Sequence, residues 1–327
     1  MNINDNNNSF AINTSLKIDH VHLRVSNLKE SVNFYQSILG FKVLKDKSIA
    51  NTTVFLASSA VNNTNTNTIS ENKEKILPLL VLNQIDNDDA ILNHKIVRKE
   101  SGLFHFAILL PERKNLASFL RHMQKNLDPQ FYEGMADHVV SESIYLHDPD
   151  YNGIEVYRDR LPWQWKWNQD KVYMVTEPLD VKDLFIQNPD EKWTELPSDT
   201  SIGHVHLHVS NLNRSKQFYQ NMLGLNYTAS YPGAYFFAAS HYHHHVATNT
   251  WMGTNILPAN NSNNKPGLDH YAIRLPYFKE EEIRELKNRL KNMGIYIDKT
   301  INKSDMQYTS SFYIYDPDRI KIQFLFH

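Results

Sequence analysis

The sequence predicts an α+β fold built from four βαβββ modules, and two internal repeats are the observations that predict it. Residues 18–41 (IDHVHLRVSNLKESVNFYQSILGF) and 202–225 (IGHVHLHVSNLNRSKQFYQNMLGL) align without a gap and are identical at 15 of 24 positions. Residues 102–111 (GLFHFAILLP) and 267–276 (GLDHYAIRLP) are identical at 7 of 10 positions. Repetition over such lengths indicates a structural unit that is used more than once. The chain therefore contains four modules in the order A, B, A, B.

Each A module opens with a predicted strand and continues with a helix. In residues 204–209 (HVHLHV) polar and apolar residues alternate with a period of two, which is typical of a strand with one buried face. Asn27 with Glu30 three residues later resembles a capping box at the start of the helix, and Gly40 marks its end. Residues 212–224 repeat this pattern. Three further strands of the first module are predicted at residues 41–44, 52–57 and 76–82.

The B modules follow the same order of elements, and the helix of the fourth module is the clearest, over residues 279–293 with Gly294 as its stop. The Asn-rich insertion at residues 62–73 is expected to be a mobile loop, and the three Trp of LPWQWKW indicate a linker packed on a surface. The predicted divisions are a disordered tail (1–17), an N-terminal domain with modules 1 and 2 (18–160), a linker (161–200) and a C-terminal domain with modules 3 and 4 (201–327).

Composition narrows the functional classes. With 34 Lys and Arg against 36 Asp and Glu, the net charge of −2 argues against nucleic acid or an anionic membrane as the main partner. The chain has no cysteine, which excludes disulfides, thiolate metal sites and Cys nucleophiles. Neither a secretory signal nor a run of roughly 20 apolar residues is present, so a cytoplasmic protein is expected. The unusual count is 16 His.

Histidine recurs at the same place in the first predicted strand of all four modules, as His20, His105, His204 and His270. A lone His on a half-buried sheet would be read as a solvent-facing residue. Because imidazole is the commonest transition-metal ligand and the pattern recurs four times, we expect at least two of these residues to bind a metal.

Glu155 is the second candidate ligand. It lies among apolar residues in a predicted strand, where a carboxylate is costly unless it is paired or bound to a metal. An outward-facing Glu on an edge strand is the plainer alternative. The equivalent position of the fourth module holds Gln323, a much poorer ligand, so only module 2 offers both His and carboxylate.

Residues 243–245 (HHH) fall in the predicted last strand of module 3. Strand alternation would place His244 on the face opposite His243 and His245. Surface histidines are the plainer alternative for two of the three. The first module has no titratable group in this strand.

The HVHLxVSNL strand, the FYQxxLG helix end and the DPDxNGIE strand resemble the vicinal-oxygen-chelate superfamily (glyoxalase, bleomycin resistance and extradiol dioxygenase proteins). The layout with two domains resembles bacterial catechol 2,3-dioxygenases, over residues 18–327 except the linker and the Asn-rich insertion. The resemblance implies that paired modules curl into two cups of mixed sheet. One cup would bind a metal through the His of an A module and the His and Glu of a B module.

The resemblance also implies three further site residues. His244, before His245-Val246-Ala247, matches the acid/base position of the ring-cleaving members. Tyr145, ten residues before Glu155, would donate a hydrogen bond to the substrate oxygen, and His138 could face the same cup.

The pairing of modules decides which ligands meet. If modules 1 and 2 pair, the ligands are His20, His105 and Glu155, and His244 lies in the other cup. If modules 2 and 3 pair, the ligands are His105, Glu155 and His204, and His244 joins them. We favour the second pairing because it gathers every unusual polar residue in one cup. The other cup would hold His20, His270 and Gln323, one carboxylate short, and is expected to be vestigial.

The implied activity is extradiol cleavage of catechol or a substituted catechol by O₂, with Fe(II) or alternatively Mn(II), giving a product of the 2-hydroxymuconate semialdehyde type. Two His and one carboxylate leave adjacent coordination positions for the diol and O₂. Such an enzyme would serve aromatic hydrocarbon catabolism, and its assembly into a homo-oligomer is left open. The rival readings are a glyoxalase-type isomerase, which would want a fourth ligand such as Glu in the last A strand, and a ligand-binding or resistance protein without catalysis.

Overall fold

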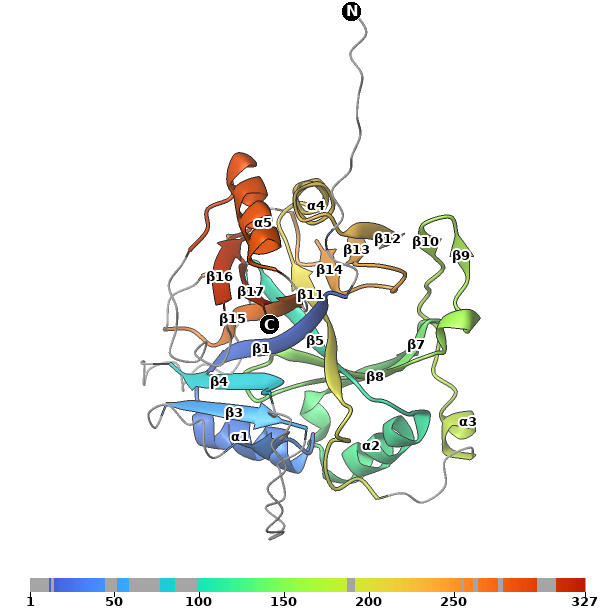
Figure 1. The fold of residues 1–327 in the computed structure, drawn as a ribbon. Helices are drawn as coiled ribbons and strands as arrows, with labels where there is room; N and C mark the ends of the chain where they lie inside the picture. Colours follow the sequence, from blue (N-terminus) through green and yellow to red (C-terminus); the bar gives the residue numbers. More distant parts are fainter. Residues whose placement is uncertain are drawn as a thin grey trace, which may run out of the picture.

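The chain folds into two mixed sheets with helices at the periphery (Figure 1). This computed structural model describes residues 12, 15–44, 52–58, 77–85, 99–186, 192–254, 256–260, 264–275, 279–298 and 310–326. The α+β class and the two cups of mixed sheet that the sequence predicts are confirmed. No helix in the described ranges is long and apolar enough to cross a membrane.

The first sheet combines modules 1 and 4, in the strand order β16-β17-β15-β1-β4-β3-β2. β1 pairs antiparallel with β15 where the modules join, and parallel with β4 of its own module. Module 1 supplies β1 (Lys17–Val25), β2 (Lys42–Val43), β3 (Thr53–Ala57) and β4 (Leu80–Gln84). Module 4 supplies β15 (Gly267–Leu275), β16 (Ser310–Tyr315) and β17 (Lys321–Phe326). We call this sheet the 1+4 cup.

The second sheet combines modules 2 and 3, in the order β12-β13-β14-β11-β5-β8-β7-β6, and we call it the 2+3 cup. β11 pairs antiparallel with β5 at the join. The favoured pairing is therefore confirmed and the pairing of modules 1 and 2 is wrong. Module 2 supplies β5 (Gly102–Leu109), β6 (Tyr132–Asp137), β7 (Ser141–His147) and β8 (Gly153–Asp159). Module 3 supplies β11 (Ser201–His208), β12 (Asn226–Tyr231), β13 (Ala234–Ala238) and β14 (Val246–Asn249).

The predicted helices are present, and each contacts a sheet. α1 (Leu28–Ser37) packs on β3 and β4, α2 (Arg113–Asn126) on β8, and α4 (Leu212–Lys216) on β13 and β14. α4 continues as a π-helical turn, η5 (Gln217–Met222). Lys287 of α5 (Glu280–Asn292) lies over the ring of Phe312 on β16. The Asn27 side chain caps α1 by accepting from the Glu30 N–H, and Gly40 ends the helix at a φ of +83°.

Period-two alternation decides what each central strand buries. On β11, Val205 and Leu207 point into an apolar core shared with Val21 and Leu23 of β1, and these two strands touch. Alternate residues of β11 therefore face away from that core, into the 2+3 cup. The two cups are thus joined through their apolar faces, and their histidine faces point apart.

The linker at residues 161–200 forms short elements of its own and packs on the 2+3 cup. It forms η4 (Pro162–Gln164), β9 (Trp167–Asn168), β10 (Lys171–Val172) and α3 (Val181–Ile186). Trp165 is buried against Val140 and Ala229, both of the 2+3 cup, whereas Trp163 is 77% exposed. The expected packing of this linker on a surface is confirmed for Trp165.

Several sequence predictions fall on residues outside the described ranges. They include the loop at 62–73 and most of the predicted tail at 1–17. Within that tail Ile12 and Leu16 are described and belong to the core, so the tail is ordered at these two positions. A third strand after α5 would lie largely in residues 299–309, which are not described, although Asp298 already bridges to Tyr313. The division into domains at 18–160 and 201–327 stays a description of the sequence, since each sheet uses both halves.

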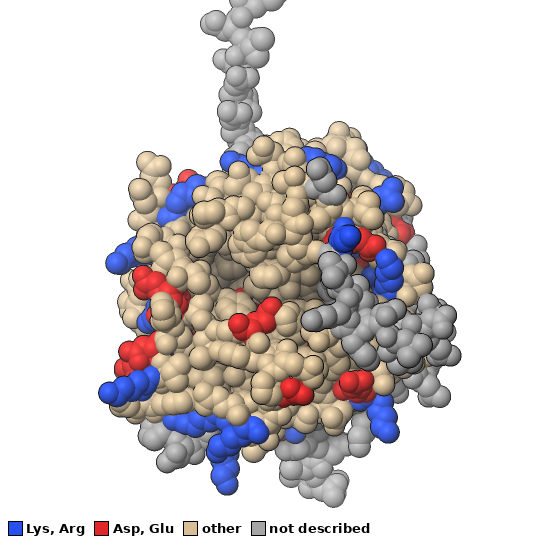
Figure 2. Space-filling model, turned by 180° about the vertical axis from the view of Figure 1, so that it is seen from behind, with Lys and Arg blue, Asp and Glu red and all other residues tan. Residues whose placement is uncertain are grey.

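Charged residues are scattered over the face opposite that of Figure 1. Figure 2 shows Lys and Arg mainly around its edge, next to Asp and Glu, and a hollow near the centre surrounded mostly by uncharged residues. The near-zero net charge is thus spread over this face in small groups of both signs.

Two repeated motifs join the cups. The Tyr35 hydroxyl on α1 donates to the Asp148 carboxylate after β7 (2.8 Å), and Tyr219 donates to Asp316 after β16 (3.1 Å). The first bond links module 1 to module 2 and the second links module 3 to module 4, so each one crosses between the sheets. The FYQ and DPD repeats therefore fix how the two cups dock.

Replacing Tyr35 with Phe is expected to lower the free energy of unfolding by about 1.5–3 kcal/mol, the usual contribution of a hydrogen bond to a charged group. Burial raises the pKa of Asp148 to about 6, so urea denaturation is best measured at a higher pH, where its carboxylate is ionised. Tyr173→Phe removes the hydroxyl from a side chain that is 53% exposed and serves as the control. Equal stability of the two variants would contradict the role of Tyr35 in docking.

Candidate metal centre

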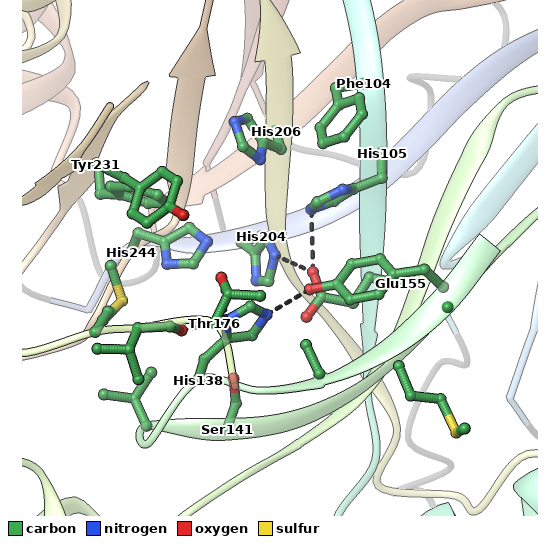
Figure 3. A pocket seen from close by; sticks show the side chains of 18 of the residues that line it. Phe104, His105, His138, Ser141, Glu155, Thr176, His204, His206, Tyr231 and His244 are labelled. Carbon is green, nitrogen blue, oxygen red and sulfur yellow. Dashed lines mark hydrogen bonds and ion pairs between the residues drawn. The ribbon is translucent and has the colours of Figure 1, made fainter. Parts of the chain in front are cut away.

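Three predicted ligands meet inside the 2+3 cup. Nε2 of His105 and Nε2 of His204 each lie 3.0 Å from Oε2 of Glu155, and the ligand atoms of all three residues lie within 4.8 Å of one another. All three side chains are buried. In Figure 3 the two imidazoles point at the carboxylate from neighbouring strands.

Strand register explains why these residues converge. His204 on β11 lies opposite Ala107 on β5, and Ala107 lies opposite Glu155 on β8. His105 precedes Ala107 by two residues and therefore shares its face. The small side chain of Ala107 leaves the space between the two flanking ligands open. The site thus depends on β11 of module 3 lying beside β5 of module 2.

The three groups suit a divalent metal. Nε2 of His105, although close to the carboxylate, is buried and forms no hydrogen bond within the described part of the chain. Oε1 of Glu155 is held by the Ser143 hydroxyl at 2.6 Å, which fixes the carboxylate and leaves Oε2 facing both imidazoles. Two imidazoles and one carboxylate that converge in this way form a donor set that accepts Zn, Fe, Mn, Co or Ni ions.

Protonation in the buried cluster favours ligation. Burial lowers the pKa of His204 to about 4, so its ring is neutral at neutral pH. Burial alone would raise the pKa of the Glu155 carboxyl, but the imidazoles of His204 and His105 hold that pKa well below its ordinary value. The cluster therefore presents the neutral imidazole of His204 beside one negative charge, which a divalent ion would compensate.

The three ligands form one wall of a cavity of about 330 Å³. Aromatic and aliphatic side chains cover most of its remaining surface, and a few polar groups lie close to the ligands. A volume of this size is in the range of roughly 300–1,000 Å³ that is usual for small-molecule sites. The apolar walls include Phe104, Val140, Met174, Tyr231, Phe236 and Trp251.

His244 lines the same cavity, and its ring centroid lies 4.1 Å from that of His204. Its Nδ1 is 2.8 Å from Nδ1 of His243, whose Nε2 is 2.8 Å from the Asp159 carboxylate. A carboxylate can only accept, so His243 donates from Nε2, and the tautomer with a single proton there accepts at Nδ1. His244 must then donate from Nδ1, which leaves its Nε2 unprotonated.

Burial lowers the pKa of His244 well below its ordinary value, in keeping with a neutral ring. The prediction that residues 243–245 lie in a strand is wrong, because β14 begins at Val246 and these residues form a bend. Without strand alternation, His243 and His244 can touch each other. All three histidines are buried, which rules out the plainer alternative of surface histidines.

Tyr145 and His138 form a second polar pair on the cavity wall, with 2.7 Å between the Tyr145 hydroxyl and Nε2 of His138. Nδ1 of His138 donates to the carbonyl of Val175 at 2.7 Å, so a neutral His138 accepts from the tyrosine. Burial, together with the charge of Glu155, raises the pKa of Tyr145 well above its ordinary value, so the phenol keeps its proton. Figure 3 shows His138 facing the Glu155 side of the cavity.

The structure adds residues that sequence reasoning missed. Asp159 and His243 orient His244, and Ser143 orients Glu155. Met174, Val175 and Thr176 of the linker line the cavity. Ser143 shares a strand face with Tyr145, so alternation could have found it. Nothing in the local sequence points to the linker residues.

The remaining predicted ligands lie in the 1+4 cup. His270 and Gln323 touch, with 3.2 Å between Nε2 and Oε1, while His20 pairs with its neighbour Asp19 at 2.9 Å. The expectation that this cup lacks a carboxylate is wrong. A β-bulge where β15 pairs with His22 and Leu23 leaves Asp269 as an extra residue, and Asp269 joins His22 and His270 in a cluster.

Two mixed sheets of paired βαβββ modules, one with a buried His, His and Glu cluster beside a cavity, define the vicinal-oxygen-chelate class of folds. The chain belongs to the glyoxalase/bleomycin resistance protein/dioxygenase superfamily, whose family profile matches residues 17–156 and 201–324. It is 36% identical over 297 residues to a catechol-2,3-dioxygenase of Bacillus subtilis (strain 168), covering 89% of this chain and 93% of that protein.

Solved structures support the same fold. A proposed dioxygenase from Bacillus subtilis has a TM-score of 0.58 at 11% identity, covering 95% of this chain and 84% of that one. Glyoxalase I from Zea mays has a TM-score of 0.51 at 14% identity, covering 95% and 92%. At these identities the likeness concerns the fold alone.

Proposed function

We propose that the chain is a metal-dependent extradiol dioxygenase that cleaves catechol or a substituted catechol with O₂, giving a product of the 2-hydroxymuconate semialdehyde type. The observation that carries the proposal is the convergence of His105, His204 and Glu155 on one wall of a cavity that also contains His244 and Tyr145. The catechol-2,3-dioxygenase relative, which matches most of the chain, supports the same reaction.

His105, His204 and Glu155 would hold Fe(II) or Mn(II). When bound, the metal supplies neighbouring positions for both diol oxygens and O₂, which removes the entropic cost of bringing them together. The protein supplies the proton transfers. His244, with Nε2 unprotonated and its ring held by His243, accepts a proton from a diol hydroxyl and later returns it.

Tyr145 donates a hydrogen bond to a substrate oxygen once a ligand displaces its contact with His138, and His138 holds the phenol in place beforehand. The aromatic walls formed by Phe104, Phe236 and Trp251 contact the ring of the substrate and limit the entry of water.

The direct test is to reconstitute the protein anaerobically with Fe²⁺ or Mn²⁺, add catechol in air and follow the yellow ring-opened product. Metal analysis of the purified protein shows which ion it retains. A glyoxalase-type isomerase would instead act on a thiol adduct of an α-ketoaldehyde, with Zn²⁺ or Ni²⁺. β14 offers no Glu as the fourth ligand that such an isomerase would want. Turnover of the thiol adduct without catechol cleavage would overturn the proposal.

His244→Phe is expected to retain the metal and to lose turnover by roughly two to four orders of magnitude, the range for a missing acid/base group. The physical reason is that Phe fills the space but offers no Nε2. His241→Phe is the matched control, because His241 is exposed and packs on Trp167. Loss of the metal from the His244 variant would mean that His244 is a ligand. Normal turnover would mean that His244 has no part in the reaction.

A further inference from the structure

The 1+4 cup contains its own cluster of two histidines and one carboxylate. Ligand atoms of His22, Asp269 and His270 lie within 4.8 Å of one another, the same separation that His105, Glu155 and His204 meet in the 2+3 cup. The rings of His22 and His270 lie 4.9 Å apart between centroids. The two cups thus share a type of donor set.

The positions of the donors differ between the cups. Gln323 replaces the carboxylate of Glu155 on the last strand, as the spacing from the DPD motif shows. The carboxylate instead comes from Asp269, at the bulge of β15, where the other cup has Phe104 at the bulge of β5. The carboxylate thus comes from the last strand (β8) in the 2+3 cup and from the first strand of the B module (β15) in the 1+4 cup.

The histidine of the A strand also changes place. His22 lies opposite His270 on β15, as His206 lies opposite His105 on β5. In the 1+4 cup this second histidine joins the cluster, whereas His20 points to Asp19, whose other oxygen pairs with Arg274. His20 is therefore held outside the cluster by its own partners.

Neighbouring groups orient the donors as they do around bound metals. Arg24 lies 3.1 Å from Oδ1 of Asp269, while Oδ2 of the same carboxylate lies 2.6 Å from Nδ1 of His270. Oε1 of Gln323 lies 3.2 Å from Nε2 of His270, and Nε2 of Gln323 is fully buried without a hydrogen-bond partner among the described residues. Nδ1 of His22 is likewise buried and unpartnered in that part of the chain.

We propose that His22, Asp269 and His270 form a second divalent-metal site, separate from the site in the 2+3 cup. Imidazole with a single carboxylate suits borderline ions such as Zn²⁺, Co²⁺ and Ni²⁺. Either ring nitrogen of His22 could supply the ligand atom, and its Nδ1 has no hydrogen bond to give up among the described residues. Gln323 stands beside the ion as a neutral group.

Positive charges near the site give a reason for modest affinity. Asp269 lines a cavity of about 330 Å³ whose wall also carries Arg24, Lys265 and Lys321. These cations lie near the incoming ion and oppose it. The second site should therefore bind more weakly than the first, which has no Arg or Lys among the described residues that line its cavity.

The test is equilibrium dialysis against Co²⁺ without oxygen, with metal analysis and the visible spectrum of bound Co²⁺. In a chain carrying Glu155→Gln and His204→Ala, which leaves the 2+3 cup with a single ligand, about one Co²⁺ per chain is expected, and Zn²⁺ should displace it. Adding His22→Ala or Asp269→Asn should weaken this binding at least about tenfold, because one of three ligands is lost. His122→Ala removes a half-buried histidine on α2 that belongs to neither cluster and should change nothing.

Gln323→Glu is the opposite test, because it returns a carboxylate to the last strand beside His270 and should tighten Co²⁺ binding. It also keeps the proposal testable if a loss variant fails to fold. No Co²⁺ bound in the Glu155→Gln, His204→Ala chain would overturn the proposal. Binding that survives both His22→Ala and Asp269→Asn would overturn it as well. Catechol turnover by the native chain is independent of either result.

Discussion

Glu155→Gln is expected to remove the metal from the 2+3 cup and to abolish catechol turnover while the protein stays folded. The amide has nearly the same shape, so the Ser143 hydroxyl keeps its hydrogen-bonding partner and the His105 and His204 rings keep a polar neighbour. What is lost is the only negative charge of the cluster. Removing a charged ligand from a divalent ion costs several kcal/mol, which corresponds to roughly a thousandfold or more in affinity.

The measurement is iron content after anaerobic reconstitution, together with product formation in air. Glu281→Gln is a matched control, since Glu281 on α5 is exposed and pairs with Arg284 at 2.9 Å, outside the cavity of the site. The control should retain iron. If the Glu155→Gln chain holds iron as tightly as the native chain, Glu155 is not a ligand. The proposed metal site would then lack its carboxylate.

Circular dichroism separates loss of the metal from loss of the fold. Buried charge is costly unless it is paired, so the sheet should stay folded when an amide replaces the carboxylate. The folded, metal-free variant is therefore the expected state.

Alternation and repetition allowed much of this architecture to be predicted from the sequence. Repeats that differ at few positions fold alike, and period-two strands place every second residue on one face. This reasoning placed His105, Glu155 and His204 on inward faces. The choice between two module pairings rested on Tyr145 and His244, which belong to neighbouring modules.

The sequence predictions that the structure contradicts share a physical cause, because the chain departs there from the geometry of an ideal strand. Residues 243–245 bend before β14, so the contact between His243 and His244 has no counterpart in a strand pattern. The bulge that brings Asp269 beside His22 adds one residue and breaks the alternation. Val175 reaches His138 across 37 residues through a linker with no periodic pattern.

Local sequence could not separate His204 from His20, because the two lie in nearly identical strands, and each is followed two residues later by another histidine. The difference is the neighbouring strand. β11 lies beside β5, which brings His204 to Glu155 on β8. β1 instead lies beside β15, whose other neighbour β17 has Gln323 at the position equivalent to Glu155.

His204→Ala is therefore expected to abolish iron binding in the 2+3 cup and reduce turnover to background. His20→Ala should leave both within about twofold of the native values, as independent sites usually do. The two variants are matched in chemistry and strand position, so they differ only in the cup that they occupy. Iron content and catechol turnover, measured for both variants, show which of the two histidines binds the metal. Loss of both in the His20 variant and not in the His204 variant would place the working site in the 1+4 cup, and His244 would then have no part in the reaction.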